Sequence, residues 1–227
     1  SLVRPSECGT MGAMSYLLRV LLPDRPGSLG SLAVALGTAG ADIISLDVVD
    51  RFDGVAVDDI VVNVPNGTFP DTLITAAEQL DGVMVDSLRP FGGILDAHRE
   101  LELIDAVAGA GAGDDQMLAD ELPAALRLGW ALVVEETTDG CRLVARGAAA
   151  PLWDGGRVEA VRHLERATAL EVDLPAEWTS MDTAVAAAPL SSGHVLVVGR
   201  PGGPSFRRSE IARLGYLTGI LRSLNAG

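Results

Sequence analysis

The stretch that most constrains the fold is residues 24–40, with the sequence DRPGSLGSLAVALGTAG. It lies between two apolar runs, residues 16–22 and 43–49, which leave no room for long loops. Pro26 suits the first turn of a helix, and Gly27 lets another group approach the backbone closely. Apolar residues then recur at helical spacing until Gly40, a usual C-terminal stop. We therefore expect strand, tight turn, helix and strand, with free N–H groups at the turn that suit a carboxylate or another small anion.

The following residues extend this pattern to six elements. Strands are predicted at residues 16–22, 43–50, 55–64 and 83–88, and helices at 28–38 and 70–80. Asp53 and Gly54 form a hairpin signal between the second and third strands. The order βαββαβ in about 75 residues predicts a ferredoxin-like α+β domain. Two helices cover one face of a four-stranded sheet, so the other face needs water, a second domain or a second copy.

Residues 15–90 resemble an ACT domain, a regulatory module that binds small molecules. The family pattern is Asp-x-Pro-Gly-x-Leu, about ten residues of helix, and Gly-x-Asn-Ile. Matching residues are Asp24, Pro26, Gly27, Leu29, Gly40 and Ile43, whereas Asp42 stands where the family commonly has Asn. We expect this domain to span residues 15–96, after a leader at residues 1–14 with Met14 as a plausible native start.

The resemblance implies a ligand and a site. ACT domains typically bind amino acids near the first strand–helix loop, often between paired copies. The implied site residues are Asp24, Arg25, Pro26, Gly27, Ser28, Leu29, Asp42 and Ile43. Backbone at residues 24–29 would receive the ligand carboxylate and Asp42 would face its ammonium, which an acceptor-only side chain can hold. The resemblance also implies a homodimer, with the helix at residues 29–39 as a candidate surface.

Residues 97–227 are predicted to form a second α+β domain with a central antiparallel sheet. Predicted helices are 97–107, 116–126, 157–168 and a last one ending at residue 224; predicted strands are 130–136, 142–146 and 194–200, and residues 177–187 fit either type. The hairpin GWALVVEETTDGCRLVARG and the closing GHVLVVGRPGGPSFRRSEIARLGYLTGIL resemble a GAF domain more faintly. The resemblance implies a sensor domain.

Charge and composition exclude several classes of function. The net charge is −14. Residues 15–96 contain four Arg and twelve acidic residues, and residues 97–227 contain twelve Arg and eighteen acidic residues. Both halves are acidic, which disfavours nucleic acid and anionic membranes as partners. No apolar run approaches the roughly 18 residues of a membrane span, and residues 1–14 lack the apolar core of a signal peptide. Two cysteines give no disulfide framework, so we expect a reduced cytoplasm.

The sequence offers no constellation for catalysis, metal binding or a cofactor. The GAGAG run at 109–113 lacks dinucleotide-loop spacing, residues 201–204 lack the Lys-Ser/Thr of a P-loop, and the three histidines are isolated. Four arginines, Arg200, Arg207, Arg208 and Arg213, form a basic concentration, read as a solvated helix start or an anion site. The expectation is a non-catalytic amino-acid sensor. The alternatives are an enzyme with its site in the C-terminal half, regulated by the N-terminal half, and an interaction module with a vestigial ACT domain.

Overall fold

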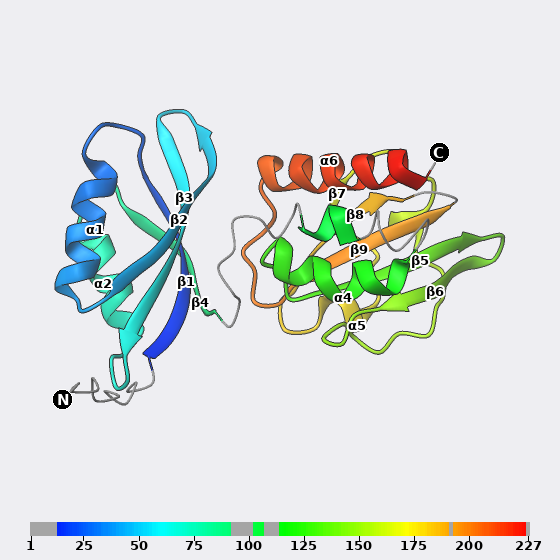
Figure 1. Ribbon diagram of the computed structural model, residues 1–227, viewed down its shortest axis with the longest axis horizontal. Coiled ribbons are helices and arrows are strands. Elements are labelled where there is room, and N and C mark those ends of the chain that lie inside the picture. The colour runs from blue at the N-terminus through cyan, green and yellow to red at the C-terminus, as the bar shows by residue number, and fades with distance from the viewer. Residues whose placement is uncertain (1–12, 92–101, 107–113, 191–192, 226–227) are drawn as a thin grey trace, which may run out of the picture. The chain divides into compact units, whose positions relative to one another are not determined.

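The computed structural model describes residues 13–91, 102–106, 114–190 and 193–225. The chain divides into two compact units, residues 1–92 and 93–227. One contains a four-stranded sheet and the other a five-stranded sheet (Figure 1). The boundary expected between residues 96 and 97 lies outside the described residues. Among the described helices, none is long and apolar enough to cross a membrane.

The first unit has the six elements that the sequence predicts, in the predicted order. They are β1 (Ala13–Pro23), α1 (Ser28–Thr38), β2 (Asp42–Phe52), β3 (Val55–Pro65), α2 (Asp71–Glu78) and β4 (Met84–Pro90). The strands pair antiparallel in the order β2-β3-β1-β4, and both helices lie on one face of the sheet (Figure 1). The ferredoxin-like α+β arrangement is confirmed.

Left-handed residues make the tight connections of this unit. Asp53 and Gly54 have φ values of 47° and 77°, as a two-residue hairpin between β2 and β3 requires. Gly40, with φ 89°, follows α1 and lets the chain turn at once into β2. The short loops hold each helix close to the sheet, so its apolar stripe is buried.

The core of the first unit lies between the sheet and its helices. Leu32 and Leu36 of α1, one turn apart, are fully buried, as is Leu73 of α2. Each such side chain contributes about 1.5–3 kcal/mol relative to an exposed position. The strands supply alternate residues to the same core, namely Tyr16, Leu18, Val20, Leu22, Ala56, Ile60, Val62 and Val64.

The second face of this sheet is buried at its centre as well. Leu17, Val57 and Val61, which alternate with the core residues, are at most 2% exposed. Arg19 and Asp59 face each other in the β1–β3 register and are also buried. The Arg19 side chain donates two hydrogen bonds to the Asp59 carboxylate, at 2.7 and 2.8 Å. This bidentate contact compensates both buried charges.

Strand β2 forms an edge of the first sheet. Among the described strands it pairs with β3 alone. It exposes apolar side chains along its length, with Ile44 at 42%, Val48 at 47% and Phe52 at 41%. A long edge strand with exposed apolar residues is a template for pairing with another strand.

The second unit has the predicted central antiparallel sheet. Its elements are α4 (Asp115–Ala125), β5 (Trp130–Thr137), β6 (Gly140–Arg146), the 3-10 turn η1 (Glu159–Val161), β7 (Thr168–Leu170), α5 (Ala176–Thr179), β8 (Ala184–Pro189), β9 (His194–Arg200) and α6 (Arg208–Asn225). Residues 102–106 are also helical. The strand order is β6-β5-β9-β8-β7. Strands β5 and β9, which come first and last in the sequence of this sheet, are therefore neighbours.

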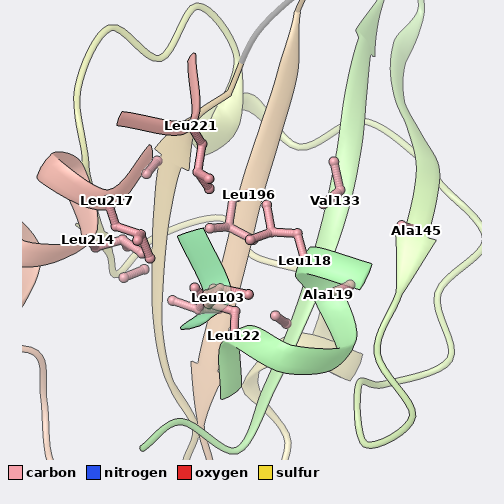
Figure 2. Close-up of a cluster of buried hydrophobic side chains, with 14 residues drawn as sticks. Leu103, Leu118, Ala119, Leu122, Val133, Ala145, Leu196, Leu214, Leu217 and Leu221 are labelled. Carbon is pink, nitrogen blue, oxygen red and sulfur yellow. The ribbon is translucent and has the colours of Figure 1, made fainter. Parts of the chain in front are cut away.

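Both faces of this second sheet are covered. On one face, leucines of α4 and α6 converge on Leu196 of β9 (Figure 2). On the other, the three tryptophans Trp130, Trp153 and Trp178 join Cys141 and strand valines in a second core. Burial raises the pKa of the Cys141 thiol, which agrees with a core residue rather than a nucleophile.

The predicted helix at residues 157–168 is wrong. The one helical turn in that range is η1, and His163 then adopts a left-handed φ of 53°, which ends helical geometry before β7 begins at Thr168. Just before η1, Gly156 exchanges two backbone hydrogen bonds with Cys141 at the start of β6. Val158 and Val161 are buried against the tryptophan core, so tertiary packing overrides the helical spacing.

The remaining helices and strands of this unit agree with their predicted positions to different degrees. Residues 177–187, which fitted either type, divide into the end of α5 and most of β8. Of the helix predicted at 97–107, residues 102–106 are helical and the rest lie outside the described residues. Asp114 caps α4 by accepting a hydrogen bond from the Met117 N–H, at 2.9 Å. Strand β9 matches its prediction at both ends.

Candidate functional site

The β1–α1 turn is the feature that most closely fits a ligand-binding backbone. Gly27 is the N-cap of α1 and has a left-handed φ of 92°. Within the described part of the chain, no side chain caps this helix, and its first turn has no acidic residue. The partial positive charge at the helix start is therefore left for another group to compensate.

Backbone hydrogen bonds fix the turn. The Asp24 N–H donates to the Gly54 carbonyl in the β2–β3 hairpin, at 2.8 Å. The Ser31 N–H donates to the Gly27 carbonyl, at 2.9 Å. Pro26 precedes the helix instead of lying in its first turn, because α1 begins at Ser28. A Cβ added to Gly27 would meet nothing within 4 Å, so space beside the backbone is open.

A shallow hollow of about 270 Å³ lies against this turn. Four of the predicted site residues line it: Arg25, Pro26, Gly27 and Ser28. The rest of its wall is Pro23, Ser31, Leu80, Asp81 and Val83. Leu29, also predicted, is 37% exposed on α1. The hollow therefore lies between the β1–α1 turn and the loop from α2 to β4.

Asp42 and Ile43 do not join the turn within one chain. Asp42 begins β2 and is paired with Asn63, which in turn pairs with Ser15 near the start of β1. Ser15 lies eight residues before Pro23, about 26 Å of extended strand at about 3.3 Å per residue. Ile43 is partly buried against the core. Within one chain, Asp42 and the turn therefore lie too far apart to hold one amino acid between them.

Several charged side chains lie near the turn on the side of β2. Arg51 and Asp24 form a long ion pair, Nε to Oδ1 at 4.0 Å, with side chains 62% and 41% exposed. Asp58 of β3 stands in register with Val20, so its side chain belongs to the helix-facing set. It is only 3% exposed, and its Oδ1 has no hydrogen-bond partner among the described residues.

Burial is the main cause of a raised pKa at Asp58. The Arg51 guanidinium opposes the rise in pKa, and the Asp24 and Asp59 carboxylates add to it. Sequence reasoning missed both Arg51 and Asp58 as candidate site residues. The available signal was an Asp-Asp pair inside the apolar strand VAVDDIVV, where two adjacent carboxylates cannot both face water.

The predicted basic concentration in the second unit does not form an open anion site around Arg200. Arg200 is 2% exposed, and its Nη2 lies 2.5 Å from Oε1 of Glu210. Its Nη1 donates to the Pro204 carbonyl at 3.1 Å, and its guanidinium lies 4.5 Å from the centre of the Phe206 ring. Arg200 thus joins the loop after β9 to the start of α6.

Histidine and metal-binding side chains were the remaining candidates for a chemical site. His194 at the start of β9 lies with Nδ1 2.7 Å from Oδ2 of Asp115 in α4, so it is not an isolated surface residue. In the described ranges, no three His, Cys, Asp or Glu side chains group closely enough to hold a metal ion.

Comparison with known proteins gives distant structural likenesses. No protein-family profile and no curated protein matches the chain. An unknown protein from Galdieria sulphuraria is 16% identical over 95% of this chain and 93% of its own, with a TM-score of 0.34. An uncharacterized protein from Thermotoga maritima is 21% identical over 35% and 99%, with a TM-score of 0.29. A formyltetrahydrofolate deformylase from Pseudomonas putida is 13% identical over 43% and 38%, with a TM-score of 0.27. All three scores are low, so the fold assignment rests on the strand order and register of the chain itself.

Proposed function

We propose that this chain is a non-catalytic sensor that binds an amino acid at the β1–α1 turn. One observation carries the proposal: the left-handed Gly27 starts α1 with no side-chain cap, beside an open hollow. Backbone N–H groups at a helix start favour a carboxylate. The resemblance of residues 24–43 to the ACT pattern supports the same location.

The charges around the turn suit a zwitterion. Arg25 lines the hollow and Arg51 lies on the other side of the turn, so cationic groups flank the place proposed for the ligand carboxylate. Asp24 and Asp58 supply carboxylates near Arg51. A ligand with one positive and one negative group finds both complements here, whereas a simple anion faces carboxylate repulsion.

A second copy would complete the site. If two β2 strands pair antiparallel with Asp47 at the centre, residues equally distant from Asp47 lie opposite each other. Asp42 of a second copy then lies beside Phe52, at the end of β2 that carries Arg51. The exposed apolar residues of β2 favour pairing along this edge, and a register centred on Asp47 would bring Asp42 to the rim of a site that it cannot reach within its own chain.

The second unit fits a role in receiving or transmitting the signal. Both faces of its sheet are closed by tightly packed cores. The faint resemblance to GAF domains supports a sensor or output role for it. Binding at the first unit would then alter how the chain engages a downstream partner, without chemical conversion of the ligand.

A thermal-shift screen of the full chain with the twenty amino acids tests the proposal. A ligand at 100 times its dissociation constant adds about 2.7 kcal/mol to the free energy of unfolding. We expect at least one amino acid to raise the melting temperature, with calorimetry confirming the binding. If none does so at millimolar concentration, the proposed function is wrong.

Gly27→Asn tests the location of the site. Asn tolerates the left-handed conformation, so the turn is kept while a side chain enters the space next to the backbone. We expect at least tenfold weaker binding by calorimetry. Gly67→Asn is the matched control, because Gly67 has φ 91° and equally open space but lies after β3. Equal affinity in the two variants would place the ligand elsewhere.

A further inference from the structure

Asp58 and Asp59 are neighbouring carboxylates in β3 that differ in how many hydrogen bonds they accept from the protein. Both are buried, with 3% and 5% of their surface exposed. Asp59 receives two hydrogen bonds from Arg19. The buried Oδ1 of Asp58 has no hydrogen-bond partner among the described residues. A carboxylate taken out of water without a donor destabilises the folded state.

The fold alone does not require a carboxylate at position 58. Asp58 occupies a helix-facing position between Ala56 and Ile60, opposite Val20. A β-branched apolar residue would continue this pattern and remove the desolvation cost. Uncompensated polar groups of this kind concentrate where proteins give up stability for recognition.

The charges near Asp58 come from three segments. Arg51 lies on β2, Asp24 in the β1–α1 turn, and Asp59 next in the strand. Helix α1, on the same face of the sheet, has no ionisable side chain. Arg51 is the only cation among the groups that act on Asp58, and Asp24 competes for it. Among the described residues near Asp58, the negative charges therefore outnumber the positive ones, and one further positive group would be favoured.

The side chain of Arg51, which stands in register with Ala56 two residues before Asp58, is weakly held. That side chain is 62% exposed, and its ion pair with Asp24 is long, at 4.0 Å. Exposed ion pairs of this kind contribute little to stability, so Arg51 can move at small cost. The guanidinium would then be free to meet a carboxylate bidentately.

From this arrangement we infer that Asp58 binds the ammonium group of the amino acid, while Arg51 moves to the ligand carboxylate beside the turn. The inference rests on the proposed function and deepens it, since it assigns the ammonium to a buried residue of the same chain. Asp42 of a second copy then lies only at the exposed rim. The site selects zwitterionic amino acids over carboxylic acids that lack the ammonium group.

The test uses the full chain with Asp58→Asn, and Asp59→Asn as the matched control. The probes are the twenty amino acids, each paired with the carboxylic acid that lacks its ammonium group, such as alanine with propionate. We expect wild type to prefer the amino acid at least tenfold by calorimetry. Asp58→Asn should abolish this preference, because an amide cannot supply the charge-assisted hydrogen bond. Asp42→Asn should change it less than threefold.

The melting temperature provides a second readout, which the two variants should change in opposite directions. Without ligand, Asp58→Asn should raise the melting temperature by removing a buried charge whose Oδ1 has no hydrogen-bond partner among the described residues. Asp59→Asn should lower it, because Arg19 then loses its buried partner. Lower stability or loss of folding in Asp58→Asn would show a structural role and overturn the inference.

The outcomes separate the two proposals. If Asp58→Asn keeps the wild-type preference for an amino acid over its deaminated acid, the inference is overturned while the proposed function stands. If no amino acid binds wild type, the proposed function fails and the inference fails with it. Loss of the preference in a variant that is at least as stable as wild type supports both.

Discussion

At the scale of single residues, Asp58 makes the stability of this protein depend on pH in an unusual direction. Its pKa in the folded chain is raised above the ordinary 3.8, so the folded state binds this proton more tightly than the unfolded state. The resulting stabilisation is complete below the unfolded pKa and is lost as pH rises through the folded pKa. Wild type should therefore be less stable than Asp58→Asn at pH 7, and the gap should narrow towards about pH 4. Melting curves of both proteins across this range measure the gap; a gap that widens on acidification would contradict the assignment.

The residues of the turn could be predicted from sequence, whereas the choice of Asp58 over its neighbour Asp59 could not. Pro26 and Gly27 have restricted or permissive backbones, so their identity alone indicates a tight turn before a helix. Asp58 and Asp59 look equivalent in sequence. Their difference depends on which faces Arg19 and Val20 of β1 present, and this register follows only from the assembled sheet.

At the scale of elements, α6 holds the second unit together through a narrow stripe. Leu217 is 4% exposed in the core drawn in Figure 2, whereas its neighbour Tyr216 is 77% exposed. We expect Leu217→Ala to lower the free energy of unfolding by about 2–5 kcal/mol through lost burial and the cavity left behind. Tyr216→Ala should change it by about 0.5 kcal/mol or less. Urea denaturation followed by circular dichroism measures both, and similar effects at the two positions would argue against this packing of α6.

Elements with strong periodicity and clear ends were predicted well, and the failure at residues 157–168 has a local cause. Helix α1 has an apolar stripe between Gly27 and Gly40, and its predicted bounds match the structure. Residues 157–168 have helical spacing too, but Gly156 precedes them and pairs with Cys141 at the start of β6. Val158 and Val161 bury themselves in the tryptophan core instead of forming a helix face. That core consists of segments distant in sequence, which local patterns do not reveal.

At the scale of the whole molecule, self-association would add Asp42 of a second copy to the rim of the proposed site, and β2 and α1 offer competing surfaces. Pairing through β2 would bring Asp42 of a second copy near the turn, so we favour β2 over the helix surface suggested by the sequence. Ile44 of β2 and Val34 of α1 are exposed by 42% and 70% and provide matched substitutions. Ile44→Lys should dissociate the dimer by placing a charge on the edge strand, while Val34→Lys should leave it intact.

Salt dependence gives an independent measure of the same assembly. Each chain has a net charge of −14, so two copies repel each other over the Debye length of about 10 Å at 0.1 M salt. We expect the dimer to strengthen as salt rises from about 0.02 to about 0.3 M, because screening weakens this repulsion while the apolar contact of β2 persists. Sedimentation velocity at several salt concentrations, with and without the amino acid selected by the thermal screen, measures the dissociation constant. Saturating amino acid should tighten the dimer, since a site shared by two copies links binding to assembly. A wild-type chain that stays monomeric at high concentration and moderate salt, with or without amino acid, would exclude the two-copy site. Dissociation by Val34→Lys in place of Ile44→Lys would move the interface to α1.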